Sequence, residues 1–414
     1  MCPTTAVTNV IPSKMARNRV ATDPAELSIA RDVSRDVSPF LQHMPKCELH
    51  VHIEGTLLPS LRWKLAQRNN ITLSHRGIVY TSLEQLEDSY NVVYNHRVKT
   101  RGDDGVGRPT FFEMYYGGME VLREQEDFYE LAMEYFEKVK EQGVVYVEPF
   151  FDIQAHTRRG VAVEKVMQGF ARAKKDAKEK FGVSHCNNLL YTSADQFEQI
   201  ESQWICCFLR DMPVESAASH YEAILPYKDL IVGIGLDSDE YDRPPTLFSD
   251  IYKRARADGF RTTAHCDVAQ KDTHEHIRQV AEVVAGTGLE RIDHGLNAAE
   301  DPKLVELIKA KALGMTIVPW AYYRHEPKEE VFPRIRLLFD AGIKVTINSD
   351  DPAYMGNNYV LENLRLTESY CDFTKQEMVQ LQKNAIGISW MSTEDKKRMN
   401  DQLDEYARKH LKSA

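Results

Sequence analysis

The chain has 414 residues, 43% of them apolar and 28% charged, and a formal net charge of −10. This composition is close to the globular average, which excludes global disorder, and the length suits two or three domains or one large α/β barrel. The acidic balance, with Lys and Arg interspersed among acids, argues against a nucleic-acid partner, because phosphate binding needs a basic face. We therefore expect a small-molecule substrate.

The seven cysteines are odd in number, irregularly spaced and without a CxxC pair, a usage typical of a reducing compartment. The N-terminal region lacks the apolar core of a signal peptide, and no apolar run reaches the roughly 18 residues of a membrane span. We therefore predict a cytoplasmic protein without a membrane partner, and we make no prediction of its oligomeric state.

Along the chain, residues 1–43 are polar, mixed in charge and without a sustained period, so we interpret them as an arm that is flexible or draped over the rest. From residue 44 onward, short β-like apolar runs alternate with amphipathic helical stretches at 127–143, 162–182 and 274–288. Eight of the apolar runs are predicted strands: 47–53, 144–151, 204–209, 230–236, 260–266, 291–295, 314–319 and 343–349.

This alternation predicts a parallel sheet with crossover helices, and eight strands is the number of a (β/α)8 TIM barrel. We expect residues 44–414 to form a single domain of this kind, with the charged helical residues 374–412 packed on its outside. The insertion at about 95–109 is rich in glycine and charge. A solvated loop is the favoured interpretation of this insertion, and a lid over the site is the alternative.

Candidate chemical residues fall at the carboxyl ends of the predicted strands, where (β/α)8 barrels assemble their active sites. Each of these residues alone would be an ordinary core or surface residue, but such a set at the ends of four strands indicates function. The set comprises His50 and His52 on the first strand, His265 on the fifth, His294 on the sixth, and Asp350 with Asp351 on the eighth.

Three imidazoles and one carboxylate suit a zinc ion that keeps one position open for water. Zinc lowers the pKa of that water toward roughly 7 and so supplies a hydroxide nucleophile. Asp351, beside the ligand Asp350, could accept the proton of the water, and His294 could orient the hydroxide. The fourth strand offers no lysine for a carbamylated bridge, so we predict a mononuclear site at the C-terminal face, with one Zn2+ per chain.

Six segments resemble the adenosine/adenine deaminase family of metal-dependent amidohydrolases, in particular its fungal and bacterial adenine deaminases. The resemblance covers about residues 44–360, and its segments occur in the family's order. They are MPKCELHVHIEGTL (44–57), FFDIQAHTRRGV (150–161), CFLRDMPVESA (207–217), GLDSDEYDRPP (235–245), RIDHG (291–295) and NSDDPAYMG (348–356).

The resemblance implies a zinc-bearing (β/α)8 barrel that deaminates a purine. Hydroxide would attack C6 of a 6-aminopurine and ammonia would leave, with His294 and Asp351 handling the hydroxide and its proton. The implied metal ligands are His50, His52, His265 and Asp350. The implied substrate contacts are Glu54, Asp237, Ser238 and Glu240.

The loop after the fifth strand departs from the family pattern His-Ala-Gly-Glu, in which the glutamate protonates the ring nitrogen N1. This chain has Val268 at the glutamate position, and valine cannot donate a proton. Loss of such an acid typically costs about 10²–10⁴-fold in rate. We predict that Asp267 supplies the proton instead, with Asp272 and Glu275 as alternatives.

A second departure follows the seventh strand, where the chain reads VPWAYYRH (318–325). Trp320, Tyr322 and Tyr323 are bulky and aromatic and should reshape the pocket wall, although packing between loop and barrel is the alternative. We assign substrate contacts to Trp320 and Tyr323.

These observations favour hydrolytic deamination of an aminopurine or a related amino-heterocycle. The missing glutamate keeps a second hypothesis open, in which a zinc-dependent hydrolase cleaves another C–N bond, such as that of an amide, an imide or a substituted heterocycle. A catalytically silent binding protein is the third hypothesis, and it is disfavoured because every metal ligand is retained.

Overall fold

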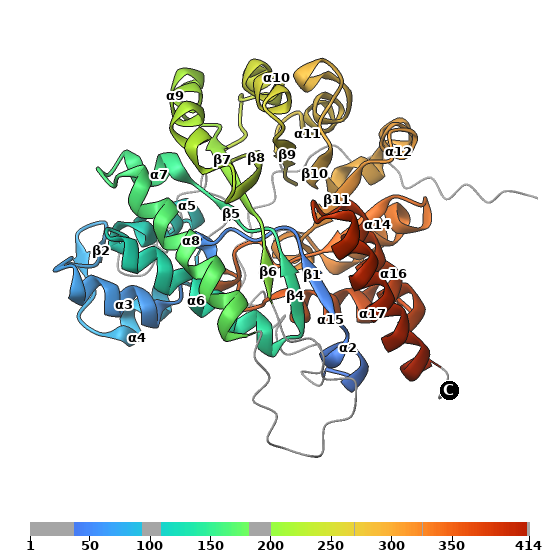
Figure 1. The fold of residues 1–414 in the computed structure, drawn as a ribbon, viewed down its shortest axis with the longest axis horizontal. Helices are drawn as coiled ribbons and strands as arrows, with labels where there is room; N and C mark the ends of the chain where they lie inside the picture. Colours follow the sequence, from blue (N-terminus) through green and yellow to red (C-terminus); the bar gives the residue numbers. More distant parts are fainter. Residues whose placement is uncertain (1–36, 93–108, 182–199, 269, 325, 412–414) are drawn as a thin grey trace, which may run out of the picture.

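The computed structural model describes residues 37–92, 109–181, 200–268, 270–324 and 326–411. Figure 1 shows central strands surrounded by helices, with α9, α10, α11 and α12 following one another along one side. Most of the predicted arm 1–43, and nearly all of the insertion predicted at 95–109, lie outside the described residues.

The central strands are parallel, and their sequences explain why. Trp204–Leu209, for example, is a run of six buried residues with no alternation, as expected for a strand covered on both faces. The strands are β1 (Lys46–Glu48), β4 (Val144–Val147), β5 (Phe150–Phe151), β6 (Glu201–Ser202), β7 (Trp204–Leu209), β8 (Ile231–Asp237), β9 (Arg261–Cys266), β10 (Arg291–His294), β11 (Gly314–Ile317) and β12 (Lys344–Ile347). A short antiparallel pair, β2 (Ser74–His75) and β3 (Ile78–Val79), lies outside this set.

Strand pairing closes the sheet into a ring. The hydrogen-bonded order is β12-β11-β10-β9-β8-β7-β5, and β1 pairs with β4. The segment after β1 completes the ring through two parallel bridges, His52 with Phe150 and Val51 with Asp350. The predicted (β/α)8 barrel is therefore confirmed, and its second strand is divided into β4 and β5 on either side of Pro149, which has no N–H to donate.

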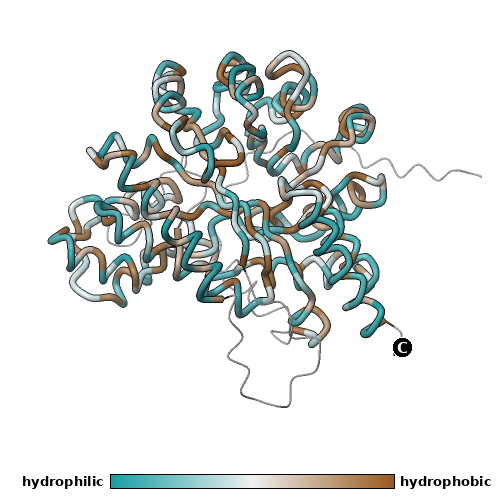
Figure 2. The backbone as a smooth tube through the Cα atoms, viewed as in Figure 1, coloured by the Kyte–Doolittle hydropathy of each residue, from teal (hydrophilic) through white to brown (hydrophobic). Residues whose placement is uncertain are grey.

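Helices cover the outside of this ring. In Figure 2, the outermost helix α17 is coloured largely hydrophilic, in keeping with its exposed face. The helices are α2 (Pro39–His43), α3 (Pro59–Arg68), α4 (Leu83–Ser89), α5 (Phe111–Gly118), α6 (Gln125–Glu141), α7 (Ile153–Thr157), α8 (Val163–Lys180), α9 (Val214–Ile224), α10 (Ser249–Ala257), α11 (Thr273–Arg278), α12 (Pro302–Ala310), α13 (Pro319–Tyr323), α14 (Lys328–Asp340), α15 (Val360–Tyr370), α16 (Lys375–Ile388) and α17 (Thr393–Leu411).

The helix predicted at 274–288 differs from the structure. Regular α-helix ends at Arg278, a wider π-type turn follows over Gln279–Val283, and Ala285 adopts a left-handed backbone with φ 56°. The apolar period continues through this region, so the pattern concealed the change in helical pitch.

The larger of two hydrophobic clusters extends from Phe40 to Tyr406, and a small second cluster consists of Phe150, Ile205 and Cys207. The hydroxyl of Tyr406 donates a hydrogen bond to the backbone oxygen of Phe40 at 2.7 Å, which ties α17 to α2. Residues 39–43, at the end of the predicted arm, thus form a helix that packs on the barrel. Within the described residues, no helix is both long and apolar enough to cross a membrane.

A buried ion pair at the other end of the strands from the candidate site yields a stability prediction. Arg291 is 1% exposed and its Nη1 lies 2.6 Å from Glu148 Oε2. The change Arg291→Met should lower the free energy of unfolding by about 3–5 kcal/mol, because it leaves the Glu148 carboxylate buried without its cation. Urea denaturation would measure the change.

The matched control is Arg261→Met. Its partner is Glu290, and the Arg261 side chain is 55% exposed, so we expect a loss of at most about 1 kcal/mol. Equal losses in the two variants would contradict the assignment of Arg291 to a buried pair that stabilises the barrel.

Candidate metal centre and active site

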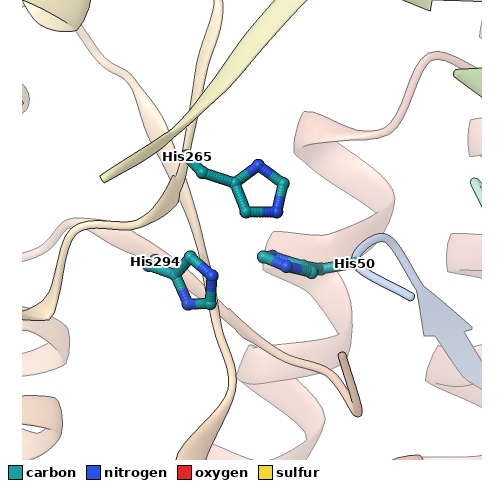
Figure 3. A group of neighbouring side chains, drawn as sticks. All are labelled: His50, His265 and His294. Carbon is teal, nitrogen blue, oxygen red and sulfur yellow. The ribbon is translucent and has the colours of Figure 1, made fainter. Parts of the chain in front are cut away.

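The candidate residues converge at the C-terminal ends of the strands. All six are at most 6% exposed, so they lie inside the barrel mouth rather than on its rim. Figure 3 shows the rings of His50, His265 and His294 facing one another. The six are His50 and His52 after β1, His265 in β9, His294 at the end of β10, and Asp350 with Asp351 after β12.

Three pairs of atoms among the four predicted metal ligands lie at short, similar separations. Nε2 of His52 lies 3.0 Å from Nε2 of His265 and 3.5 Å from Oδ1 of Asp350. Nε2 of His50 lies 3.4 Å from the same oxygen. A tetrahedral zinc ion with bonds of about 2.0–2.1 Å separates its ligand atoms by roughly 3.3 Å, so the donor set fits such an ion.

A hydrogen-bonded chain behind His50 fixes its tautomer. The hydroxyl of Thr316 donates to Oδ1 of Asp293 at 2.8 Å, so its only proton is used. Nδ1 of His50 lies 2.8 Å from that hydroxyl oxygen and must therefore donate to it. Nε2 of His50 is left as a bare acceptor, buried and without a hydrogen-bond partner, which is the form that binds a metal.

Burial keeps the neighbouring imidazoles neutral. It lowers the pKa of His52 to about 3 and that of His294 to about 4, and it lowers the pKa of His265 well below its usual value. Two neutral nitrogens that meet at 3.0 Å, as those of His52 and His265 do, need a proton or a cation between them. The arrangement is therefore suited to a bound cation.

Ser238, His294 and Asp350, each at the C-terminal end of a strand, have left-handed backbone conformations. The φ angles are 72° for Ser238, 62° for His294 and 66° for Asp350. Such conformations cost of order 1–3 kcal/mol for residues other than glycine and gather at functional sites. They turn the chain at the ends of three strands so that these side chains face inward.

Asp267 lies beside His294, at the outer edge of the candidate site. Its Oδ1 is 3.7 Å from Nδ1 of His294, and its side chain is 34% exposed. Partial burial, together with the charges of Glu240 and Asp350, raises the pKa of Asp267 above its usual range. Val268 is 2% exposed and packs in the core, so the apolar residue at the position of the family acid is turned away from solvent.

Glu240, predicted to contact substrate, lies beneath the loop that carries Asp267. One of its oxygens accepts a hydrogen bond from the backbone N–H of Asp267 at 2.7 Å, and the other lies 2.6 Å from Nη1 of Arg210. Arg210 also donates to the backbone oxygen of His265 at 2.8 Å. These contacts connect the ligand strand to the Asp267 loop and give Glu240 a supporting position.

The alternative proton donors, Asp272 and Glu275, are less well placed than Asp267 to protonate a substrate in the site. Glu275 is paired with Arg278, which lowers the pKa of Glu275 to about 2, so this carboxyl is ionised at neutral pH. Asp272 is exposed at the start of α11. Among the candidates, the structure brings Asp267 to His294.

Asp351 packs directly against Gly55. A Cβ atom added to Gly55 would lie 1.9 Å from Oδ1 of Asp351 and 2.8 Å from its Cα, so only glycine permits this approach. Oδ1 of Asp351 is buried without a hydrogen-bond partner. The close approach to Gly55 thus fixes the position of this carboxyl in the site.

The aromatic residues after β11 separate into two groups. The hydroxyl of Tyr322 lies 3.1 Å from Nδ1 of His294, so this tyrosine belongs to the site. Tyr323 packs its ring on Phe332 and Tyr370, with ring centroids 5.7 and 5.8 Å away, on the outer side of α13. The structure does not bring Tyr323 to the histidine cluster, and Tyr322 takes the inward position instead.

Trp320 is 7% exposed, and its indole N–H is buried without a hydrogen-bond partner. Its ring centroid lies 6.3 Å from that of Tyr323. The substrate contact assigned to Trp320 therefore stays a prediction.

The remaining predicted contacts lie on the other side of His52. The hydroxyl of Tyr116 donates to Ser238 Oγ at 2.7 Å, and Nδ1 of His52 lies 3.5 Å from Asp237 Oδ2. Glu54 Oε1 lies 2.7 Å from Nε2 of His156. Asp152 and Tyr115 lie in the same cluster but were not predicted from the sequence. The position of Asp152 at the end of the second strand could have indicated its place in the site.

A closed parallel barrel with buried His and Asp side chains at its C-terminal end defines the class of metal-dependent barrel hydrolases. The family model described as adenosine deaminase matches residues 45–406. The chain therefore belongs to the adenosine deaminase family, which confirms the family predicted from the sequence motifs.

Individual relatives agree with this assignment. An uncharacterized deaminase of Schizosaccharomyces pombe is 40% identical over 372 residues, covering 90% of this chain and 98% of the relative. The adenine deaminase of Acinetobacter baylyi is 35% identical, covering 89% and 99%. The crystal structure of adenine deaminase from Arthrobacter aurescens superposes with a TM-score of 0.74 at 32% identity, covering 88% of this chain and 99% of that chain.

Proposed function

We propose that the protein is a zinc-dependent hydrolase that deaminates an aminopurine or a related amino-heterocycle. The observation that carries the proposal is the gathering of the four ligands in a buried site, where the separations His52–His265, His50–Asp350 and His52–Asp350 are 3.0, 3.4 and 3.5 Å. Relatives named adenine deaminase, 33–35% identical over most of this chain, support a purine-like substrate. The metal ligands are His50, His52, His265 and Asp350.

A zinc ion held by these ligands would lower the pKa of a water molecule toward roughly 7 and make it a nucleophile. His294 and Asp351 handle that water and its proton. Asp351 accepts the proton of the water, and His294, which burial keeps neutral and whose Nδ1 lies 3.1 Å from the Tyr322 hydroxyl, orients the water.

Asp267 supplies the acid that this reaction needs. As the water oxygen bonds to the ring carbon that carries the amino group, electron density moves to the adjacent ring nitrogen, and the Asp267 carboxyl donates its proton there. The C–N bond then breaks, and the nitrogen leaves as ammonia with one proton taken from water. The hydrogen left on the added oxygen is released as the carbonyl forms and restores the proton of the Asp267 carboxyl. The raised pKa of Asp267 supports this role, because it favours the protonated form.

A second candidate function is hydrolysis of another C–N bond, such as that of a cyclic amide. The specific observation in its favour is Val268, which is buried and apolar at the position of the family's glutamate. A substrate that needs no ring protonation would not require that acid.

One assay distinguishes the two. Ammonia release and loss of ultraviolet absorbance are measured with adenine, adenosine, N6-substituted purines and simple cyclic amides. We expect turnover of at least one aminopurine; turnover of cyclic amides alone would favour the second function. His274→Ala is the control variant, because His274 is 45% exposed and outside the site.

We also propose a cytoplasmic location and a single domain over residues 44–414. The five described cysteines are free and buried, which supports a reducing compartment. The continuous core supports one domain.

A further inference from the structure

Asp293, in strand β10, is a fully buried carboxylate that the proposed reaction does not use. The parallel register of the barrel places His265 of β9 beside it on one side and Thr316 of β11 on the other. Residues in register on neighbouring strands point their side chains to the same face of a sheet. The three side chains therefore share the inner face of the barrel, where the candidate metal centre lies.

Both oxygens of the Asp293 carboxylate are held in place by neighbouring strands. Oδ1 accepts a hydrogen bond from the Thr316 hydroxyl at 2.8 Å, and Oδ2 accepts one from the Thr263 hydroxyl at 2.6 Å. Nε of Arg291 lies 3.5 Å from Oδ1 and complements the negative charge. Contacts from β9, β10 and β11 thus fix the orientation of this carboxylate.

Each oxygen of Asp293 also leads to a different proposed metal ligand. Oδ1 reaches His50 through the Thr316 hydroxyl, whose oxygen lies 2.8 Å from Nδ1 of His50. Oδ2 lies 3.7 Å from Nδ1 of His265, a buried nitrogen without a hydrogen-bond partner. The other ring nitrogen of His265 faces Nε2 of His52 at 3.0 Å, so Nδ1 of His265 is turned away from the metal side and toward Asp293.

An imidazole that binds a metal through Nε2 carries its proton on Nδ1, and a carboxylate that accepts this proton fixes the ring and raises its basicity. Asp293 is placed to act in this way on two rings, directly on His265 and through a hydroxyl on His50.

A purely structural role for Asp293 explains these contacts less well. The close ion pair of Arg291 is with Glu148, at 2.6 Å, and its separation from Asp293 is longer, at 3.5 Å. The shorter contacts of Asp293 are with the hydroxyls of Thr263 and Thr316, on the two strands that flank β10. Glu148 therefore serves the buried ion pair, and Asp293 is available to the metal ligands.

We propose that Asp293 is a positioning residue shared by His50 and His265, which holds both rings in the tautomer that binds the metal through Nε2. This inference rests on the proposed function, because it takes these two histidines as zinc ligands. A single change at Asp293 should then weaken two of the four ligands together. Partners of this kind typically contribute about 10–100-fold to metal affinity.

The test measures the dissociation constant for Zn2+ by competition with a chelator. Asp293→Ala removes both arms, so we expect zinc to bind about 10–100-fold more weakly than in the wild type. Thr316→Val breaks only the arm to His50 and should cost less. Asp293→Asn keeps one acceptor oxygen and should recover part of the affinity. The visible absorption spectrum of the Co2+-loaded protein reports coordination geometry and should change in Asp293→Ala.

Asp127→Ala is the matched control. Asp127 is also a fully buried carboxylate, in the first turn of α6, and it accepts hydrogen bonds from the backbone N–H groups of Arg123 and Glu124 at 2.8 Å each. Its loss should lower the free energy of unfolding but leave the zinc affinity and the Co2+ spectrum unchanged. Circular dichroism would verify that every variant is folded.

Wild-type zinc affinity in folded Asp293→Ala would overturn this inference and leave the proposed function standing. Equal losses in Asp293→Ala and Thr316→Val would also overturn it, because Asp293 would then act through His50 alone. Equal losses in Asp293→Ala and Asp127→Ala would assign the effect to general destabilisation. If Asp293→Ala does not fold, Asp293→Asn decides, and wild-type affinity in that variant overturns the inference. A wild type that binds no metal would overturn both proposals.

Discussion

His265→Ala is expected to abolish metal binding and turnover together. The change removes one of four ligand atoms, and it leaves Nε2 of His52 without its neighbour at 3.0 Å. A bound metal contributes several kcal/mol to transition-state stabilisation, so we expect kcat to fall by about 10³-fold or more. Metal content after extensive dialysis, measured alongside ammonia release, checks both parts of the expectation.

The wild type should retain about one equivalent of zinc under the same conditions. His274→Ala is the control, because it also removes an imidazole but from an exposed position on α11. Circular dichroism would verify that His265→Ala is folded. Undiminished activity in a folded, metal-free variant would rule out the metal centre as the source of the nucleophile.

Asp267→Asn is expected to lower kcat for an aminopurine by about 10²–10⁴-fold, the usual contribution of a general acid. The amide keeps an oxygen that can accept the hydrogen bond from the N–H of Val268, which is 2.6 Å long, so the loop conformation should persist. KM should change little, because the side chain is replaced by one of equal size. Steady-state kinetics with the best aminopurine of the substrate panel provides the measurement.

Asp272→Asn serves as the comparison, since Asp272 is a nearby acid that is exposed at the start of α11. If this variant lost the activity and Asp267→Asn retained it, the acid would be Asp272. If both retained full activity, a reaction that needs no ring protonation would be favoured.

The barrel and its ligand positions could be predicted because both depend on local pattern. Strands buried on both faces give continuous apolar runs, and residues at the carboxyl ends of parallel strands meet whatever the details of the loops. His265 and Asp350 could therefore be placed together although 85 residues separate them along the chain.

Contacts made through loops could not be predicted in this way. The rotation of the five-residue helix α13 about its axis decides which tyrosine faces His294. The pattern of strands in the sequence does not specify that rotation. The support that Thr316 and Asp293 give to His50 likewise depends on packing between β10, β11 and the end of β1. Position along a strand shows that these side chains point inward, but not which partner each one meets.

The closure of the ring has a consequence for folding. Where the first strand meets the eighth, the N–H of His52 donates to the oxygen of Asp350 at 2.9 Å, and the N–H of Asp350 donates to the oxygen of His50 at 3.0 Å. The backbone bonds that join the two ends of the barrel thus belong to three of the proposed metal ligands. An ion bound there cross-links segments 300 residues apart in sequence. An ion that binds only the closed ring therefore increases the free energy of unfolding by its binding free energy. Metal affinity and barrel stability are thermodynamically linked in this way.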